Sequence, residues 1–176
     1  MHRYGRLAVL DKARTDQVSI RVVRPDDRER IVEAFRGLDP RSVYLRFFSY
    51  KKELEEEELR RVTECDGVSE AALVATVENG DRQIIVGLGN YVRCGAAADI
   101  AFAVEEDFQG RGIASRLLRQ LVDRARANGI VRFEADVLAE NAPMLAVLRN
   151  SGLRMRTSHA HGVVHATLIL AQEGDA

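Results

Sequence analysis

The sequence predicts an α/β domain built on a mixed sheet with helices on both faces. Apolar residues change along the chain between the two-residue repeat of strands and the three-to-four-residue repeat of helices. Short turns join neighbouring strands at Asn79-Gly80-Asp81 and beside Gly162, which predicts two hairpins. Between the hairpins a strand is connected by a glycine-containing loop to an amphipathic helix, and another strand follows the helix. This order indicates a mixed sheet of about six to seven strands.

The first half of the chain combines helix-start signals with hairpin chemistry. Pro25 and the two aspartates after it begin the first helix, because proline suits the first turn and carboxylates favour the helix N-terminus. Oppositely charged side chains four residues apart support a second helix with a solvated face. The expected elements are a strand over 18–24, helices over 25–37 and 53–65, with Glu56 paired to Arg60 and Glu57 to Arg61, and strands over 71–77 and 83–92.

The second half alternates strands and helices before it ends in a hairpin. Asn128-Gly129 is an apt stop for the helix after the glycine loop. The residues that repeat with helical period in this helix are Ile113, Leu117, Leu118, Leu121, Val122 and Ala125. The expected elements are a strand over 99–104, a helix from 113 to about 128, a strand over 131–138, a helix over 141–150, and strands over 153–158 and 163–170. Residues 1–17 and 171–176 are expected to flank a single domain at 18–170.

The segment Gln109-Gly110-Arg111-Gly112-Ile113-Ala114 joins strand to helix through a loop able to wrap an anion. The first N–H groups of a helix lack intrahelical partners and the macrodipole adds roughly half a positive charge, so a phosphate is favoured there. Glycines also let backbone approach the ligand closely. Neither the Walker loop nor the dinucleotide fingerprint fits, because Ala114 precedes Ser115 where lysine is needed and Ser115 replaces the third glycine. An ordinary strand-to-helix turn is the alternative.

The same segment matches the Gln/Arg-x-x-Gly-x-Gly/Ala signature of the Gcn5-related N-acetyltransferases, and the chain resembles that family over about residues 18–170. The opening strand and turn at 21–27, the late Asn141 and the segment Ser151-Gly152-Leu153 extend the resemblance. The segments 42–48, 98–102 and 140–145 resemble more narrowly the bacterial protein-lysine acetyltransferase branch, whose members act on acyl-CoA synthetases.

The resemblance implies a splayed sheet with acetyl-CoA in the gap. In the family, the strand at 99–104 and the strand from 131 part at their ends, and the pantetheine arm lies between them. Backbone at 102–104 is then expected to hold the arm, and the glycine loop the pyrophosphate. The cofactor-binding residues that the resemblance implies are Phe102, Ala103, Val104, Gln109, Gly110, Arg111, Gly112, Ile113, Ala114 and Asn141.

Acetylation of a lysine requires a base, because a free amine with a pKa of ~10.4 is neutral in only about one molecule in 2,500 at pH 7. Asp99 is the candidate, since it heads an apolar strand where lysine-acetylating relatives usually carry glutamate. Its shorter side chain favours a water relay. The N–H of Val104, carried over from the family, is the candidate donor to the developing oxyanion. A purely structural Asp99 is the alternative, and the other carboxylates considered are Glu134, Asp136 and Glu140.

Many relatives carry a tyrosine that protonates the leaving thiolate. Leu148 occupies that position here, so no general acid is assigned. Tyr44 and Tyr91 are the alternatives.

The histidines His159, His161 and His165 suggest a metal site, but no nearby carboxylate or cysteine is expected to complete it, and no metal is expected. The two cysteines, Cys65 and Cys94, are expected to be reduced thiols.

Composition suits one domain with a real core, at 176 residues with 46% hydrophobic and 30% charged side chains. A formal charge of −1 without a basic stripe argues against nucleic-acid binding, and no apolar run approaches the ~20 residues of a membrane span. A cytoplasmic location is expected.

The resemblance implies an acetyl-CoA-dependent N-acetyltransferase acting on a primary amine, preferably a protein lysine, as in an acyl-CoA synthetase. A CoA-binding regulatory module without turnover and a small-molecule amine acetyltransferase are the alternatives. The sequence identifies neither the acceptor nor the oligomeric state.

Overall fold

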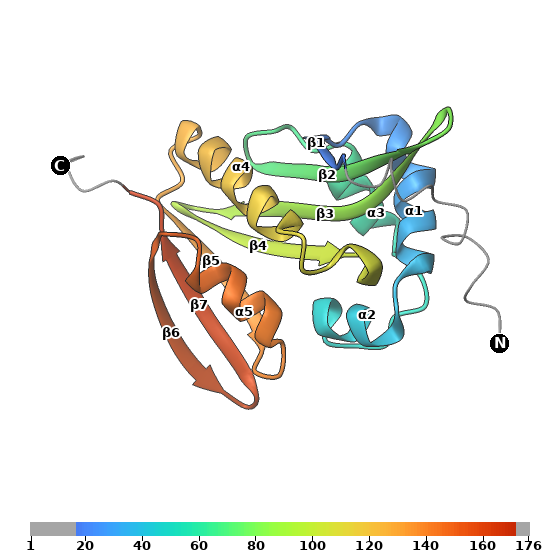
Figure 1. Ribbon diagram of the computed structural model, residues 1–176. Coiled ribbons are helices and arrows are strands. Elements are labelled where there is room, and N and C mark those ends of the chain that lie inside the picture. Colours follow the sequence, from blue (N-terminus) through green and yellow to red (C-terminus); the bar gives the residue numbers. More distant parts are fainter. Residues whose placement is uncertain (1–16, 172–176) are drawn as a thin grey trace.

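A seven-stranded sheet with the order β1-β2-β3-β4-β5-β7-β6 runs through residues 17–171, the part of the chain that this computed structural model describes. Helices cover both faces of the sheet (Figure 1), which confirms the predicted α/β class. In chain order the elements are β1 Ser19–Val22, the 3₁₀ turn η1 Pro25–Asp27, α1 Arg28–Gly37, α2 Pro40–Phe47, α3 Glu56–Thr63, β2 Glu70–Asn79, β3 Arg82–Cys94, β4 Ala97–Val104, the 3₁₀ turn η2 Glu106–Phe108, α4 Ile113–Ala127, β5 Arg132–Leu138, α5 Ala142–Arg149, β6 Arg154–Ala160 and β7 Val163–Ile169.

The sheet is antiparallel except at its centre, where β4 and β5 run parallel. Helix α4 connects these two strands and packs over β2, β3 and β4. The β5 side carries the hairpin β6–β7, as the sequence predicted. The predicted domain boundaries stay predictions, since residues 1–16 and 172–176 lie outside the described part.

The helix α2 was missed by the sequence analysis, although its start has a readable signal. The carboxylate of Asp39 accepts a hydrogen bond from the N–H of Arg41 at 3.0 Å, and Pro40 occupies the first helical position. The helix ends at Phe47 and is followed by Phe48, whose φ of 59° is left-handed. Because α2 contacts β4 and β5, it forms one wall of the space where these strands part.

One predicted ion pair in α3 is wrong and the other is confirmed. Arg61 lies 3.2 Å from Glu57 as expected. Glu56 pairs instead with Arg28 of α1, and this contact ties the two helices together. Both pairs are on the solvent side, where such contacts stabilise by only tenths of a kcal/mol.

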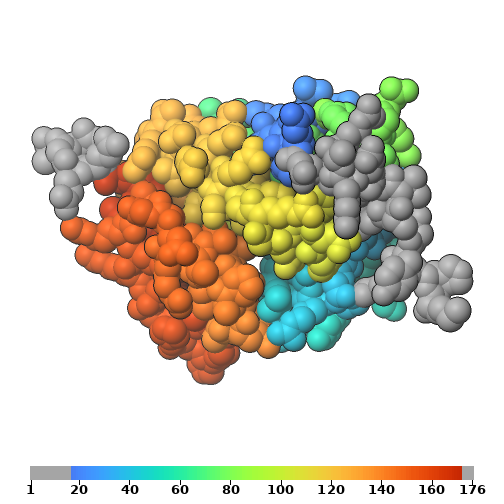
Figure 2. Space-filling view, in the orientation of Figure 1, coloured from blue at the N-terminus to red at the C-terminus, as the bar shows by residue number. Residues whose placement is uncertain are grey.

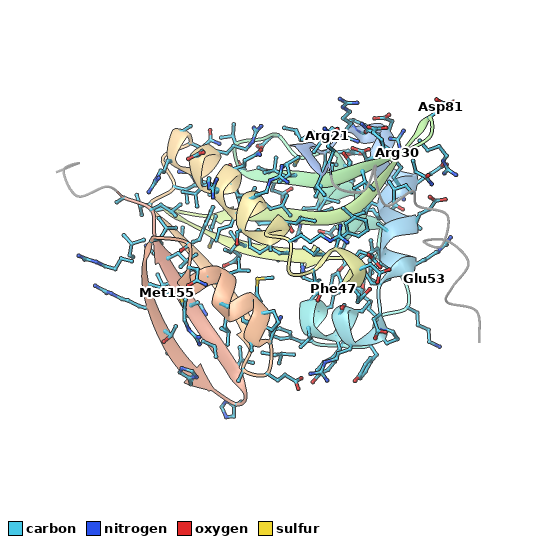
Figure 3. All side chains as sticks on the ribbon, in the orientation of Figure 1. Arg21, Arg30, Phe47, Glu53, Asp81 and Met155 are labelled. Carbon is cyan, nitrogen blue, oxygen red and sulfur yellow. The ribbon has the colours of Figure 1, made fainter. Side chains whose placement is uncertain are left out.

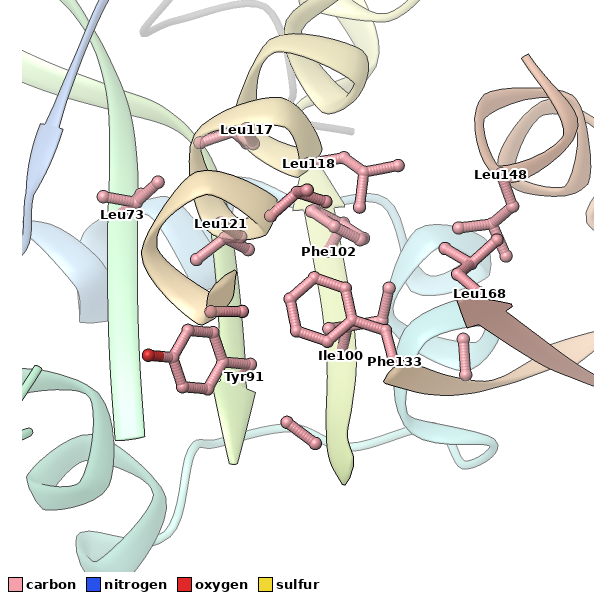
Figure 4. Packing of buried hydrophobic residues seen from close by; sticks show 14 of the residues in the cluster. Leu73, Tyr91, Ile100, Phe102, Leu117, Leu118, Leu121, Phe133, Leu148 and Leu168 are labelled. Atoms are coloured by element: carbon pink, nitrogen blue, oxygen red, sulfur yellow. The ribbon is translucent and has the colours of Figure 1, made fainter. Parts of the chain in front are cut away.

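The larger core lies between the sheet and helices α4 and α5. All six residues predicted for the apolar stripe of α4 are buried, and Figure 4 shows the leucines of α4 over Ile100, Phe102 and Phe133. A smaller core covers the opposite face, where Ile31 of α1 and Leu59 of α3 pack against β2 and β3. The two cores hold the sheet from both sides. None of the helices within residues 17–171 is long and apolar enough to cross a membrane.

Candidate functional site

The strands β4 and β5 pair at three positions only and then separate. The pairs are Ala97 with Arg132, Ala98 with Phe133, and Asp99 with Glu134. Beyond Asp99, the edge of β4 that faces β5 has no strand partner. This geometry confirms the splayed sheet that the family resemblance implies.

A cleft of about 1160 Å³ occupies the gap between the strands. Its walls come from α2, β4, the glycine loop, β5 and α5. Figure 2 shows that three of these elements meet on one face: α2, α5 and the segment that precedes α4. All of the predicted cofactor-binding residues line this cleft except Arg111. The guanidinium of Arg111 lies instead over the ring of Phe108, 4.9 Å from its centre.

The free edge of β4 presents the N–H of Val104 to the cleft. The next residue, Glu105, donates its N–H to the carbonyl of Val86 on β3 at 2.9 Å. Because successive backbone groups of a strand point to opposite sides, the N–H and carbonyl of Val104 face the gap. The side chain of Gln109 donates to that carbonyl at 2.9 Å, so the loop is fixed to the strand. Within the described chain, the N–H of Val104 has no acceptor.

The glycine loop leaves the start of α4 open. Gly110 and Gly112 have φ values of 75° and 74°, a left-handed conformation that favours glycine. No side chain caps α4, and no backbone acceptor within residues 17–171 meets the N–H groups from Gly112 to Ser115. A Cβ atom at either glycine would meet no heavy atom within 4 Å. The loop therefore fits a pyrophosphate, with free donors, a favourable helix dipole and room for the ligand.

Asn141 has a structural task besides its predicted contact with the cofactor. Its Oδ1 accepts a hydrogen bond from the N–H of Met144 at 3.2 Å and so caps α5. The remaining amide group borders the cleft. Asn141 thus fixes the helix that forms the wall opposite β4.

Asp99 is an exposed carboxylate at the point where the strands part. It borders both the cleft and a second cavity of about 390 Å³, which lies on the face covered by α1 and α3. No described residue forms a hydrogen bond or an ion pair with the carboxylate of Asp99. A carboxylate in this position is free to accept a proton from a molecule in the cleft.

The neighbouring carboxylate of Glu134 is fully engaged. Its Oε1 accepts from Arg132 at 2.8 Å, and its Oε2 accepts from the hydroxyl of Thr167 at 2.6 Å. The Nε2 of His165 lies 3.1 Å from the same Oε2. Burial favours the neutral acid, but these hydrogen bonds and the charge of His165 outweigh burial and lower the pKa of Glu134. Glu134 is therefore a poor candidate for the base.

His165 has carboxylate partners on the neighbouring strand β5. Its Nδ1 lies 2.6 Å from Asp136, and this hydrogen bond, together with the charges of Asp136 and Glu134, raises the pKa of His165 against the opposing effect of burial. The sequence analysis considered these carboxylates only as candidate bases and did not foresee their contacts with His165. The signal was the shared strand face of Glu134 and Asp136. Within residues 17–171 no cluster of His, Cys, Asp or Glu could hold a metal, and both cysteines are free.

Neither tyrosine considered as a general acid reaches the cleft. Tyr91 is buried, and its hydroxyl accepts from Asn128 at 3.0 Å and bonds the carbonyl of Val68 at 3.3 Å. Tyr44 stacks on Tyr50 with ring centres 4.8 Å apart. Leu148 is buried at the wall of the cleft. In the part of the chain that the structure describes, no tyrosine lines the cleft.

Glu105 is an ionisable group that the sequence analysis missed. Burial raises its pKa to about 7, and the charges of Asp107 and Glu106 add to the effect. It borders the smaller cavity, on the same face of β4 as Asp99. Its only sequence signal is its place at the head of a run of three acidic residues, which is common on solvated loops.

Known proteins with this sequence pattern are acetyltransferases. Residues 38–153 match the Acetyltransferase (GNAT) family. Acetyltransferase PA5475 of Pseudomonas aeruginosa is 31% identical over 129 residues, which cover 72% of this chain and 69% of that protein. Acetyltransferase Pat of Mycolicibacterium smegmatis is 32% identical over 136 residues; the match covers 76% of this chain but only 40% of the longer Pat.

A solved structure supports the same family membership. The GNAT domain of PAT from S. lividans superposes with a TM-score of 0.78 at 32% identity, covering 89% of this chain and 93% of that domain. The similarity therefore extends over nearly all of the described residues, including the strands that part and the loop before α4.

Proposed function

Since the chain belongs to the Gcn5-related N-acetyltransferase family, whose members use acetyl-CoA, we propose that it acetylates lysine side chains of proteins with Asp99 as general base. The carrying observation is the position of Asp99, an unpaired carboxylate at the point where β4 and β5 part. Acetyl-CoA supplies an acetyl group activated as a thioester.

The chain's own groups suit the binding of acetyl-CoA. The unpartnered N–H groups from Gly112 to Ser115 would hold the pyrophosphate at the start of α4. The free edge of β4 from Ile100 to Val104 offers backbone donors and acceptors to the amide-containing arm. Asn141, which caps α5, faces this edge across the cleft.

Asp99 would remove the proton that makes a lysine unreactive. At pH 7 the protonated amine dominates by about 2,500 to one, which corresponds to roughly 4.6 kcal/mol against attack. The exposed carboxylate can take this proton directly or through one water molecule. Glu134, whose oxygens are occupied by Arg132, Thr167 and His165, cannot do so without breaking those contacts.

The N–H of Val104 would stabilise the negative charge that develops on the acetyl oxygen during attack. It faces the gap, it has no acceptor in the described chain, and it is fixed in place by the ladder with β3 and by the bond from Gln109. A donor that is already oriented loses little free energy in reorganisation, which is why such donors accelerate acyl transfer.

A protein lysine is the preferred acceptor for two reasons. The segments 42–48 and 140–145, which form parts of α2 and α5 at the cleft, resemble the protein-acetylating branch. The chain is also about one-third identical to two Pat proteins. The cytoplasmic location predicted from the sequence is part of the same proposal.

The proposal is tested by incubating the purified chain with radiolabelled acetyl-CoA and three acceptors: a lysine peptide, a cell lysate and a set of small amines. Label in lysine residues of peptide or lysate protein supports it. Label only in small amines moves the function to small-molecule acetylation, and acetyl-CoA binding without transfer to any amine identifies a binding module.

A further inference from the structure

Arg46, near the end of α2, is a mostly buried cation without a counter-ion. Its guanidinium lies 3.5 Å from Oδ1 of Asn90, a long contact, and 4.6 Å from the centre of the Phe47 ring. Phe47 is labelled at the end of α2 in Figure 3. Among the described residues, no carboxylate comes within ion-pair distance of Arg46. Burial accordingly lowers the pKa of Arg46 to about 10, although Glu58 opposes the effect.

Glu58, the acidic group whose charge acts on Arg46, cannot serve as the missing partner. Glu58 accepts from Nζ of Lys51 at 2.6 Å with one oxygen and from the N–H of Glu55 at 2.7 Å with the other. Both oxygens are thus committed to neighbours within their own segment. A guanidinium has five N–H donors, and among the described residues Asn90 is the only acceptor that this side chain meets.

A second buried arginine in the same chain shows what a structural ion pair looks like. Arg21 donates to both oxygens of Asp27, at 2.7 and 2.9 Å, and to the side chain of Gln83. Its donors are satisfied within the fold. Within residues 17–171 the guanidinium of Arg46 has only the long contact with Asn90. No buried side-chain nitrogen there lacks a hydrogen-bond partner, so its remaining N–H groups are open to the two cavities and available to an external anion.

Arg46 lies where the two cavities meet, on the same side of the sheet as Asp99. Both residues line both cavities. Asn90, the contact of Arg46, pairs with Ala101 across the β3–β4 ladder, two positions along β4 from Asp99. At the rise of an extended strand this separation is about 7 Å. An acceptor whose amine meets Asp99 therefore has Arg46 within reach of a nearby group.

We propose that Arg46 binds a carboxylate of the acceptor, so that the enzyme selects lysines with an aspartate or glutamate close in the polypeptide. The inference rests on the proposed function. A guanidinium binds carboxylate through two parallel hydrogen bonds, and such charge-assisted bonds are stronger than those between neutral groups. Apolar side chains of the smaller cavity lower the local dielectric constant and so strengthen this attraction.

The test uses two peptide series with one lysine each, in which a single aspartate or a single asparagine occupies each of the four nearest positions. Wild-type enzyme should acetylate at least one aspartate peptide with a kcat/KM about 10-fold above its asparagine counterpart. In Arg46→Gln this preference should disappear through a rise in KM for the aspartate peptide alone, and in Arg46→Lys it should return in part. Free lysine, which carries its own α-carboxylate, distinguishes a small-molecule source of the anion.

Controls separate this role from folding and from the cofactor. Arg60→Gln removes the same charge from an exposed position on α3 and should keep the preference. Acetyl-CoA affinity of Arg46→Gln, measured by calorimetry, should stay within a few-fold of wild type. Equal turnover of both peptide series by wild type overturns the inference while leaving the proposed function intact, as does an equal loss for both series in Arg46→Gln. Absence of turnover with every lysine peptide overturns the proposed function itself.

Discussion

Asp99 and Glu134 are the last paired residues of β4 and β5, and their side chains lie on the same face of the sheet although their surroundings differ. Glu134 accepts hydrogen bonds from Arg132 and Thr167 and contacts His165. The carboxylate of Asp99 has no hydrogen-bond or ion-pair partner among the described residues. The strands that form the cleft therefore separate beside one carboxylate that is hydrogen-bonded and one that is free, and this difference is the reason for proposing Asp99 as the base.

Replacing Gly112 by valine should weaken acetyl-CoA binding by more than about 10-fold without unfolding the domain. Gly112 has a φ of 74°, which a β-branched residue adopts only with strain, and the loop would turn its N–H groups away from the pyrophosphate. Calorimetry on the folded variant measures the affinity. Gly80→Val is the matched control, because Gly80 has a φ of 62° in the distant β2–β3 turn. Unchanged affinity in Gly112→Val would remove the pyrophosphate assignment.

The loop and the helix after it could be predicted because their signals are local. The apolar stripe of α4 and the left-handed glycines depend on residues a few positions apart. The separation of β4 from β5 depends on how distant segments pair, so only the family resemblance supplied it. The same limit applies to side-chain partners: His165 meets Asp136 across 29 positions, and Arg46 meets Asn90 across 44.

The buried carboxylate of Asp27 should dominate the acid sensitivity of the fold. It accepts hydrogen bonds from Arg21, from the N–H of Arg24 and from Arg30 (Figure 3 labels both Arg21 and Arg30), and these lower its pKa to about 2. Because the folded pKa is below the unfolded value, the stabilisation is present above pH 4 and is lost as pH falls toward 2. Its size is about 2 kcal/mol.

Asp27→Asn should therefore lower the free energy of unfolding at pH 7 by about 3 kcal/mol, since it also leaves Arg21 without its counter-ion. Urea titrations at pH 7 and pH 3 measure this loss, which should be smaller at pH 3. Asp26→Asn is the control, because the Asp26 carboxylate is 67% exposed and lies 3.5 Å from Arg30. A loss that is the same at both pH values would show that Asp27 acts through packing alone.

Glu105→Gln should stabilise the protein at alkaline pH. Burial raises the folded pKa of Glu105 to about 7, above the unfolded value of 4.5, so ionisation opposes folding as pH rises through this interval. The variant should exceed wild type by about 1 to 3 kcal/mol at pH 8 and by much less at pH 5. Thermal or urea unfolding at the two pH values gives the comparison. Glu53→Gln, at an exposed position before α3, should change stability at neither pH.

Asp99→Asn keeps the size of the side chain but cannot accept a proton, so kcat should fall by ~10²- to 10⁴-fold while acetyl-CoA affinity stays within a few-fold. The deficit should shrink at alkaline pH, where the lysine amine loses its proton without help. Rates of acetyl transfer to a lysine peptide from pH 6 to pH 10 measure both effects.

Glu105→Gln is the informative comparison, since a carboxyl with a pKa of about 7 on the same face of β4 is the competing base. Turnover that survives Asp99→Asn at pH 7 but is lost in Glu105→Gln would move the base to Glu105. Loss in Asp99→Asn alone, with its deficit relieved at high pH, identifies Asp99 as the group that takes the amine proton.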